Sequence, residues 1–445
     1  MAPDAHALEK TYLAIDLKSF YASVECADRG LDPFATDLVV ADPTRSPNTI
    51  CLAITPALKA KGVRNRCRVR EIPQGIPYIT AMPRMHRYME VSAQVYAIYL
   101  RYVSSQDAWP YSVDEAFLDV TPYQALYGPN ARALAKRIIA TVREETGVSA
   151  TAGIGPNMFL CKVALDLMAK HAADGIGQLD EKTFRHDVWF HHPITDIWGI
   201  GPGIARRLAR ADVYDLAGIC ATDPTWLRGE FGRNAEWLID HAWGLEPCSI
   251  ADARGYVPRA RSLSNGQVLM RDYGFGEARV VLREMAWQSC LDLRQQALAC
   301  DTVGLYVGYS GQAELFGHGG GQRGLGHQTA GEREVTDALL ALYDQTVARN
   351  VPIRRVCLWL GGVVPAAIAA PTLFDNPAAD AREARLAGAV MRARRRFGPN
   401  TVLSGTSLLP AANARERNLQ IGGPPCVRTC AKKSAGYLWH PRGQT

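Results

Sequence analysis

Long apolar runs are absent from this 445-residue sequence, and their absence excludes an integral membrane protein with helical spans. No stretch approaches the ~18 uninterrupted apolar residues that a membrane-spanning helix needs. The first ten residues, MAPDAHALEK, also lack the apolar core of a signal peptide. We therefore expect a cytoplasmic protein with no membrane partner.

Cysteine patterns that indicate disulfides or metal are scarce. The sequence has 11 cysteines, an odd number, and most stand alone in apolar runs, as Cys26 and Cys51 do. Such residues are typical of reduced thiols packed in a core. Cys426 and Cys430, with His440 further on, give only a partial zinc spacing because a fourth ligand is missing. The pattern favours reduced thiols over a disulfide framework and argues against zinc.

Charge of one sign is not in large excess. Lys and Arg number 50 against 44 Asp and Glu, so the net charge is +6, which permits a polyanionic partner without requiring one. Hydrophobic residues make up 47% and charged residues 21%, which favours neither disorder nor a fibrous protein. The length suits roughly three domains of about 100–200 residues each.

Strands and helices are predicted to alternate in the first part of the chain. Residues 11–16 (TYLAID) have the pattern of a buried strand that ends in an acid, and a helix is expected to begin at Ser19, a candidate N-cap. Helical spacing recurs over residues 86–103 and 134–142, and a hairpin around Asp114 and Glu115 lies between them. These elements predict an α+β domain with helices on one face of the sheet.

The predicted secondary structure changes along the rest of the chain. The β-like runs within residues 38–54 predict a small subdomain before Pro73, and the chain becomes helical after Gly177. From about residue 256, strand and helix patterns return, with a glycine-dense stretch at 317–331 that is expected to be a hairpin loop.

Three acids stand where strands end or bend. Asp16 closes the first strand, and Asp114 and Glu115 occupy the hairpin. Carboxylates at adjacent strand ends can converge, and convergent carboxylates repel one another unless hard divalent cations neutralise them. A pair of Mg²⁺ ions ~3.5–4 Å apart is an arrangement that supports phosphoryl transfer. The ordinary alternative is that Asp16 caps a helix and the other two acids fill a turn, and spacing alone does not decide.

The flanking residues favour the catalytic interpretation. IDLKSFYASVE at 15–25 resembles the first motif of the Y-family translesion DNA polymerases, hydrophobic-Asp-x-x-x-Phe-Tyr/Phe-Ala-x-x-Glu, and YSVDEAFLDV at 111–120 resembles their Ser-x-Asp-Glu motif. The resemblance runs from about residue 11 to 410 and is nearest the UmuC-like bacterial branch. It implies low-fidelity, template-directed DNA synthesis past lesions, in DNA repair and the SOS response, by a protein associated with the nucleoid.

The same resemblance implies a fold. It is an α+β right-hand polymerase with a ferredoxin-like palm, small fingers, a helical thumb with a helix-hairpin-helix, and an α/β little finger. The implied boundaries are 1–30 and 78–170 for the palm, 31–77 for the fingers, 171–250 for the thumb, 256–365 for the little finger, and 366–445 for a linker, basic helix and tail.

Carried over residue by residue, the resemblance assigns the metal site. Asp16, Asp114 and Glu115 match the catalytic ligands of two Mg²⁺ ions, and the backbone carbonyl of Leu17 matches a main-chain ligand. Tyr21 matches the aromatic steric gate, whose ring would clash with a ribose 2′-hydroxyl. The alternative for Tyr21 is an aromatic residue of the helix core.

An incoming deoxynucleoside triphosphate needs cations and free N–H groups. The helix start at Ser19 and Phe20 offers N–H groups, and Lys59 is the first phosphate candidate. Lys170 matches the family's second cation, although its spacing from Lys162 is one residue longer than in the best-known members. Pro56 stands where many members have a phosphate-binding tyrosine.

Primer-template DNA is the second partner that the resemblance implies. GIGPGIARRL at 199–208 resembles a helix-hairpin-helix, in which Gly201 and Gly203 would present turn N–H groups to a phosphate and Arg206 would add charge. Arg261 is expected to grip the DNA backbone in the third domain. The alternatives are an ordinary glycine-containing turn and solvated basic faces.

A sliding clamp is the last candidate partner. APTLFD at 370–375 resembles a clamp-binding box in which only Leu373 and Phe374 match, so clamp binding and an unrelated linker both stay open. The alternative function is a catalytically inactive accessory protein of polymerase fold that binds DNA and the clamp. Such relatives typically lack the three acids, which this sequence has.

Overall fold

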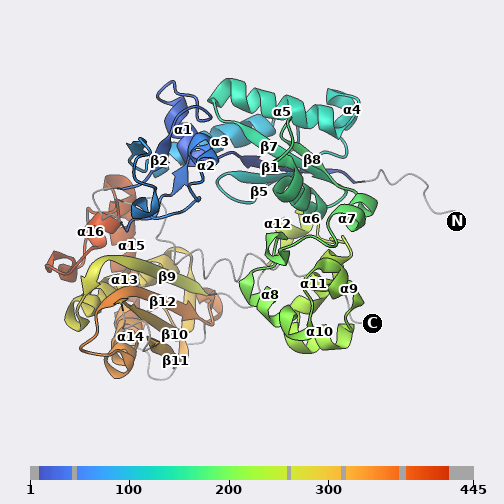
Figure 1. Cartoon of the computed structure of the whole chain (residues 1–445). Helices are drawn as coiled ribbons and strands as arrows, with labels where there is room; N and C mark the ends of the chain where they lie inside the picture. The colour runs from blue at the N-terminus through green and yellow to red at the C-terminus, as the bar shows by residue number, and fades with distance from the viewer. Residues whose placement is uncertain (1–9, 43–47, 258–261, 312–316, 370–376, 420–445) are drawn as a thin grey trace. The chain divides into compact units, whose positions relative to one another are not determined.

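The computed structural model describes residues 10–42, 48–257, 262–311, 317–369 and 377–419 (Figure 1). The chain divides into two compact units, the first reaching Tyr256 and the second beginning at Val257. Among the described residues, no helix is long and apolar enough to cross a membrane.

A five-stranded sheet forms the centre of the first unit. Its order is β5-β6-β1-β7-β8, with β1 antiparallel to both β6 and β7 and β7 parallel to β8. The strands are β1 (Tyr12–Leu17), β5 (Ala108–Pro110), β6 (Glu115–Asp119), β7 (Ala150–Gly155) and β8 (Ile176–Gln178). The central β1 places Asp16 beside the first residue of β6.

Helices cover both faces of this sheet, so the expectation of helices on one face is wrong. Leu13 and Ile15 of β1 pack in one core cluster with residues of α3 (Met85–Tyr99) and α5 (Ala131–Thr146). Tyr12 and Ala14 point the other way and pack with α6 (Met158–Val163) and α12 (Ile250–Gly255). Because β1 is apolar at nearly every position, it has no polar face to present to water.

Glycines let a helix lie unusually close to β7. After α6 the chain continues as a π-helix, η2 (Ala164–Ala169). A Cβ on Gly153 would lie 2.0 Å from the carbonyl oxygen of Cys161, and one on Gly177 would lie 2.3 Å from that of Ala164. No larger residue fits there unless the backbone moves, so the glycines set the depth of α6 and η2 against the sheet.

A smaller sheet and a group of helices complete the first unit. The sheet has the order β3-β2-β4 (Ala53–Ile54, Leu38–Val40, Ile79–Ala81) and packs with α2 (Pro56–Ala60) and η1 (Val69–Glu71), while α1 (Phe20–Ala27) follows β1. The other helices are α4 (Gln124–Tyr127), α7 (Glu181–Asp187), η3 (Ile194–Asp196), α8 (Pro202–Leu208), η4 (Ala209–Ala211), α9 (Leu216–Ala221), α10 (Pro224–Phe231) and α11 (Asn234–Ala242). The division of this unit into palm, fingers and thumb stays a prediction.

The second unit is an antiparallel sheet with two helices on one face. Its order is β11-β10-β12-β9 (His318–Thr329, Leu298–Tyr309, Ile353–Gly361, Leu263–Tyr273), and α13 (Phe275–Gln295) and α14 (Glu332–Thr346) pack against it. The short β13 (Val364–Pro365) and η6 (Ala366–Ile368) follow β12. Helix α15 (Pro377–Phe397) docks on α13, where Arg394 lies 4.5 Å from the ring centroid of Trp287. The remaining short helices are η7 (Gly405–Leu408) and α16 (Ala414–Arg417).

The glycine-dense stretch at 317–331 is largely strand β11, so the prediction of a hairpin loop there is wrong. Gly320 has a φ of 112°, and a Cβ on it would lie 2.0 Å from the carbonyl oxygen of Leu305 on β10. Glycine at this position therefore allows the backbones of β11 and β10 to lie close together. The pairing between the strands outweighs the low strand propensity of glycine.

We expect Gly153→Ala to destabilise the first unit by about 1–3 kcal/mol, because the added methyl group collides with the backbone of α6. Thermal unfolding of the purified protein measures this. Gly229→Ala in α10 is the matched control, since the structure has open space around Gly229 and alanine favours a helix. Equal melting temperatures for Gly153→Ala and the parent would contradict the close approach.

Candidate active site

Asp16 and Glu115 face each other across β1 and β6. Their Cα atoms are paired in the antiparallel register, and directly opposite residues project to the same side of a sheet. The neighbouring Asp114 accepts a hydrogen bond at its carbonyl from the backbone N–H of Leu17, at 2.9 Å. The fold therefore brings together the three acids that the sequence singles out.

Ser112 shapes the bend before β6. Its hydroxyl accepts the backbone N–H groups of Asp114 and Glu115, at 3.3 and 3.0 Å, and donates to Oδ1 of Asp114 at 2.7 Å. The motif contains this serine, but no role was predicted for it. The hydroxyl turns the chain so that two consecutive acids stay at the strand end.

The carboxylates repel one another. Burial, and then the charges of Glu115 and Asp114, raise the pKa of Asp16 to about 7, while Lys170 and Lys162 act in the opposite direction. A raised pKa of this kind marks a group whose negative charge lacks sufficient compensation. The site as it stands therefore favours additional positive charge.

Lys162 supplies part of that positive charge. Only 5% of it is exposed, and its Nζ lies 2.8 Å from Oε1 of Glu115 and 3.0 Å from Oδ1 of Asp166. Burial lowers the pKa of Lys162, but Asp166 and Glu115 outweigh burial and raise it, so the ammonium stays charged. One signal for this role is present in the sequence, a lysine in the otherwise apolar run MFLCKVAL.

The extra residue between Lys162 and Lys170 is taken up by the π-helix η2. A π-helix holds more residues in each turn than an α-helix. One additional residue can therefore be accommodated within the turn, and the residues after it keep nearly the same position. Lys170 Nζ lies 2.9 Å from Oδ1 of Asp166, and the charge of Lys170 acts on both Asp16 and Lys59. The irregular spacing thus leaves Lys170 beside the acids.

Lys59 supplies a further positive charge near Asp16. It lies in α2, whose first residue is Pro56, a position that suits proline because the first N–H of a helix needs no partner. Loss of solvent lowers the pKa of Lys59, Asp16 opposes this, and Lys170 adds to it. Lys59, Lys162 and Lys170 therefore all lie within electrostatic reach of Asp16.

The turn between β1 and α1 is tight. Ser19 has a φ of 49°, in the left-handed region, and its side chain makes no capping hydrogen bond, so the prediction of a side-chain N-cap is wrong. Phe20 is buried, and Tyr21 in the first turn stacks on Tyr88 of α3 with ring centroids 4.5 Å apart. Tyr21 therefore stands five residues after the first acid and on a fixed aromatic support.

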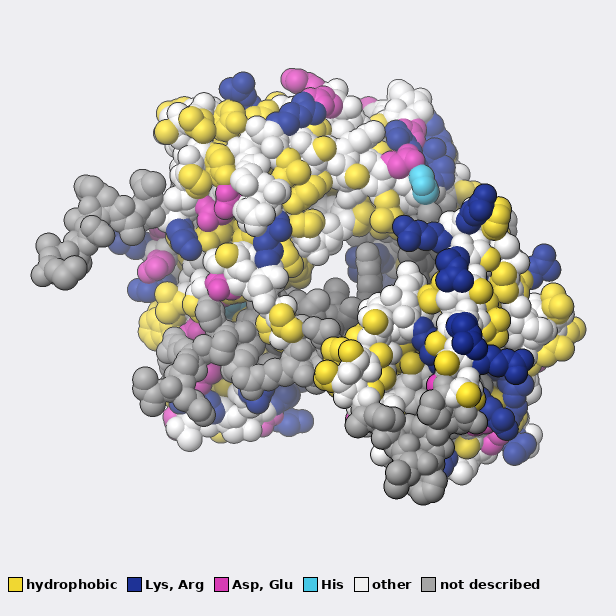
Figure 2. All heavy atoms as spheres, turned by 180° about the vertical axis from the view of Figure 1, so that it is seen from behind, with side chains coloured by type: hydrophobic (Ala, Val, Ile, Leu, Met, Phe, Trp, Pro, Cys, Tyr) yellow, Lys and Arg dark blue, Asp and Glu magenta, His cyan; other side chains and the backbone are white. Residues whose placement is uncertain are grey.

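The stretch at 199–208, for which a helix-hairpin-helix is predicted, follows η3 and includes α8, and that motif stays a prediction. Gly199 has a φ of 92°, Gly201 is the N-cap of α8, and Gly203 lies in its first turn with open space around its Cα. Arg206 is exposed, whereas Arg207 pairs with Glu230 at 2.7 Å. On the face that Figure 2 shows, Lys and Arg side chains gather in places at the surface.

Six predicted residues lie outside the described part of the chain. They are Arg261, Leu373, Phe374, Cys426, Cys430 and His440.

Comparisons with known proteins identify the family. The impB/mucB/samB family model matches residues 15–166, and the model of its C-terminal domain matches residues 260–373. The chain is 30% identical to "DNA polymerase IV 2" of Bacillus subtilis (strain 168), over 93% of this chain and 98% of that protein. The chain belongs to the Y family of DNA polymerases. It is also 29% identical to the "Putative UV-damage repair protein UvrX" of the same organism, over 93% and 97% of the two chains.

The fold agrees with this membership. The "Y-family DNA polymerase chimera Dbh-Dpo4(243-245)-Dbh" superposes with a TM-score of 0.63 at 18% identity, and covers 80% of this chain and 99% of that one. The predicted α+β right-hand polymerase fold is therefore confirmed, and so is the prediction of a DNA-directed DNA polymerase of the translesion class.

Members of this family use divalent metal ions, and the donors present suit such ions in kind. They are carboxylate and carbonyl oxygens, the ligands of hard cations. As the side chains stand, no three or more His, Cys, Asp or Glu residues in the described ranges lie close enough to hold a metal. In this arrangement Glu115 accepts a hydrogen bond from Lys162, and Asp114 accepts one from Ser112.

We expect Lys162→Met to destabilise the Y-family polymerase by about 3 kcal/mol, because it leaves the partly buried Glu115 without its cation and Asp166 with Lys170 alone. Thermal unfolding at neutral pH measures the loss, and added Mg²⁺ should recover part of it by neutralising the same acids. Lys136→Met is the matched control, since its pair with Asp174 is exposed and worth little. Identical melting curves for both variants would contradict the role of Lys162.

Proposed function

We propose that this polymerase transfers nucleotides at Asp16, Asp114 and Glu115 with two Mg²⁺ ions, the backbone carbonyl of Leu17 adding a ligand. The observation that carries the proposal is the pairing of Asp16 with Glu115 across β1 and β6. Burial, together with the charges of Glu115 and Asp114, raises the pKa of Asp16 to about 7. When bound, the two ions would lower the pKa of the primer 3′-hydroxyl and stabilise the departing pyrophosphate.

The protein's own contribution begins with an exchange of partners. Glu115 is held by Lys162, and Lys162 is also held by Asp166. If Glu115 held a metal ion, Lys162 would keep its contact with Asp166 and would not be left without a partner. Asp166 in turn keeps Lys170 near the acids.

Lys59 and Lys170 are proposed to bind the triphosphate of the incoming nucleotide. Both lie within electrostatic reach of Asp16, and Lys59 takes on the larger share because Pro56 has no hydroxyl to offer. The N–H groups at the start of α1, next to Ser19 and Phe20, are further candidates for the phosphates.

DNA and clamp contacts complete the proposal. Gly201, Gly203 and Arg206 are proposed to meet the backbone of primer-template DNA, with Arg261 as a second contact. Binding of the sliding clamp through Leu373 and Phe374 stays a prediction from the sequence.

Asp16→Asn should lower primer extension by about 10³-fold or more, since it removes a charge that the metal ions require. Single-nucleotide incorporation with Mg²⁺ measures this, and DNA binding followed by fluorescence anisotropy should be unchanged. Asp119→Asn, at the far end of β6, is the matched control and should extend normally. Extension by Asp16→Asn at the parent rate would refute the assignment, and DNA binding by the parent without any extension would favour the inactive accessory protein.

Tyr21→Ala should raise incorporation of ribonucleotides relative to deoxynucleotides by about 10- to 100-fold, because the ring no longer blocks the 2′-hydroxyl. The measurement is the ratio of kcat/KM for the two sugars opposite one template base. Tyr21→Phe keeps the ring and should keep the discrimination. An unchanged ratio in Tyr21→Ala would remove the steric-gate role.

A further inference from the structure

Behind the proposed steric gate lies a second tyrosine. The rings of Tyr21 and Tyr88 are nearly parallel, with centroids 4.5 Å apart and an interplanar angle of 19°. Tyr88 is fully buried on α3, whereas Tyr21 lies partly open at the start of α1. One face of the Tyr21 ring therefore packs on the fully buried side chain of Tyr88.

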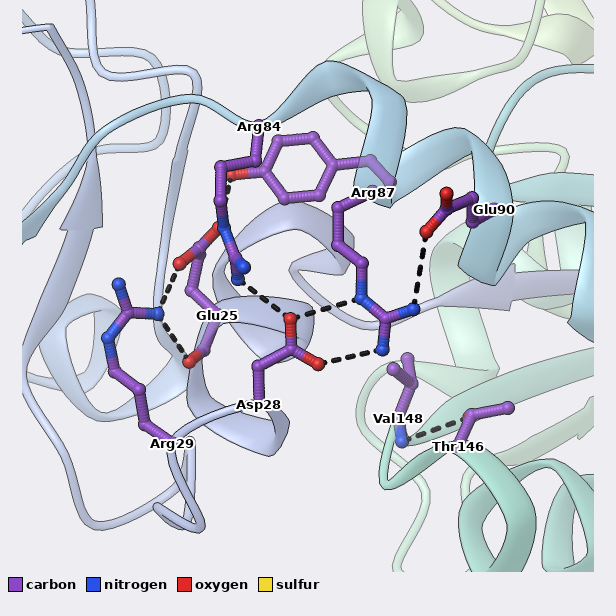
Figure 3. A network of polar contacts seen from close by, with 9 residues as sticks. Glu25, Asp28, Arg29, Arg84, Arg87, Glu90, Thr146 and Val148 are labelled. Carbon is purple, nitrogen blue, oxygen red and sulfur yellow. Dashed lines mark hydrogen bonds and ion pairs between the residues drawn. The ribbon is translucent and has the colours of Figure 1, made fainter.

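Tyr88 is itself held by a buried carboxylate. Its hydroxyl donates to Oε1 of Glu25 at 2.8 Å, and Nε of Arg84 donates to the same oxygen at 2.7 Å. Glu25 is fully buried and stands one helical turn after Tyr21, on the same side of α1. Arg29 donates to the other carboxylate oxygen and, at 2.7 Å, to the carbonyl of Glu25 (Figure 3).

Glu25 stays ionised in this setting. Burial raises the pKa of its carboxyl, but the hydrogen bonds from Arg84, Arg29 and Tyr88 outweigh burial, so the pKa is lowered. A carboxylate that accepts this many charged and polar donors has little freedom to rotate.

A second acid ties the network to α3. Asp28 accepts from Arg84 at 2.8 Å and from Arg87 at 2.8 and 3.1 Å, and Arg87 also reaches Glu90 at 3.5 Å (Figure 3). One acid of α1 and the acid at its C-cap are thus bound to two arginines at the start of α3. The contacts fix α1 against α3 directly behind Tyr21.

The sugar gate needs such support for a geometric reason. A tyrosine side chain can adopt several staggered χ1 rotamers, and a ring that swings away leaves space for a 2′-hydroxyl. Functional side chains hold their geometry only when packing and hydrogen bonds behind them restrict those rotamers. The ring face of Tyr88 supplies the packing, and Glu25 fixes Tyr88.

We propose that Tyr88 and Glu25 are positioning residues for sugar discrimination, which hold the ring of Tyr21 in the orientation that excludes ribonucleotides. The inference rests on the proposed gate role of Tyr21. Neither residue would touch the nucleotide. Their effect reaches the sugar only through Tyr21.

The test is the ratio of kcat/KM for deoxynucleotide over ribonucleotide, measured with the full-length protein on one primer-template. Tyr88→Leu removes the stacked ring and should lower the ratio about two- to tenfold, the range expected for loss of one aromatic pair. Tyr88→Phe keeps the ring but loses the bond to Glu25, and should lower the ratio less. Glu25→Gln should resemble Tyr88→Phe.

Two comparisons separate positioning from general damage. Tyr102→Leu removes another buried tyrosine of the same core, which contacts Tyr127 and Thr141, and should leave the ratio unchanged even if it lowers stability. Tyr88→Leu combined with Tyr21→Ala should lower the ratio no further than Tyr21→Ala alone, because Tyr88 acts through Tyr21.

The outcomes distinguish the two claims. If Tyr21→Ala leaves the ratio unchanged, the gate itself fails. If Tyr21→Ala lowers the ratio while Tyr88→Leu, Tyr88→Phe and Glu25→Gln do not, the gate stands and the positioning role is overturned. Additive losses in the double variant would also overturn it. Should Tyr88→Leu fail to fold, Tyr88→Phe and Glu25→Gln still decide the question.

Discussion

Repulsion between carboxylates at the paired ends of β1 and β6 is the constraint around which this active site is arranged. The antiparallel register fixes Asp16 opposite Glu115, so the chain cannot separate the charges without breaking its central strand pair. Burial and these neighbours raise the pKa of Asp16 to about 7. Lys162, Lys170 and Lys59 compensate in part, and the remaining imbalance is what makes the site suited to divalent cations.

The packing of α6 and η2 against the sheet brings compensating positive charge to the acids. Gly153 and Gly177 let α6 and η2 lie directly against the sheet, which brings Lys162 to 2.8 Å from Glu115. The π-helix then accommodates one additional residue before Lys170. The longer spacing between Lys162 and Lys170 therefore corresponds to a local change from α-helix to π-helix. The charge of Lys170 still acts on Asp16.

Residues within the two acidic motifs could be located from the sequence because motif and strand end coincide there. Lys162 could not, since a lysine in an apolar run is usually explained by its position on a helix surface, and only the fold reveals two carboxylates beside it. The second helical layer and strand β11 were missed for a related reason. Tertiary packing determines whether an apolar strand is covered on both faces, and close backbone pairing determines whether a glycine-rich segment is a strand.

The proposed metal ligand Asp16 and the proposed sugar gate Tyr21 lie on one short piece of chain. Asp16 is the second-last residue of β1, and Ser19, with a left-handed φ, leads into α1. Tyr21 lies in the first turn of α1, and Glu25 lies one turn later. Because α1 has only eight residues, it could not fix the gate relative to the acids by its own stability. The ion pairs of Glu25 and Asp28 with the start of α3 supply the missing rigidity. The spacing between Asp16 and the ring of Tyr21 is thus held in part by the contacts between α1 and α3.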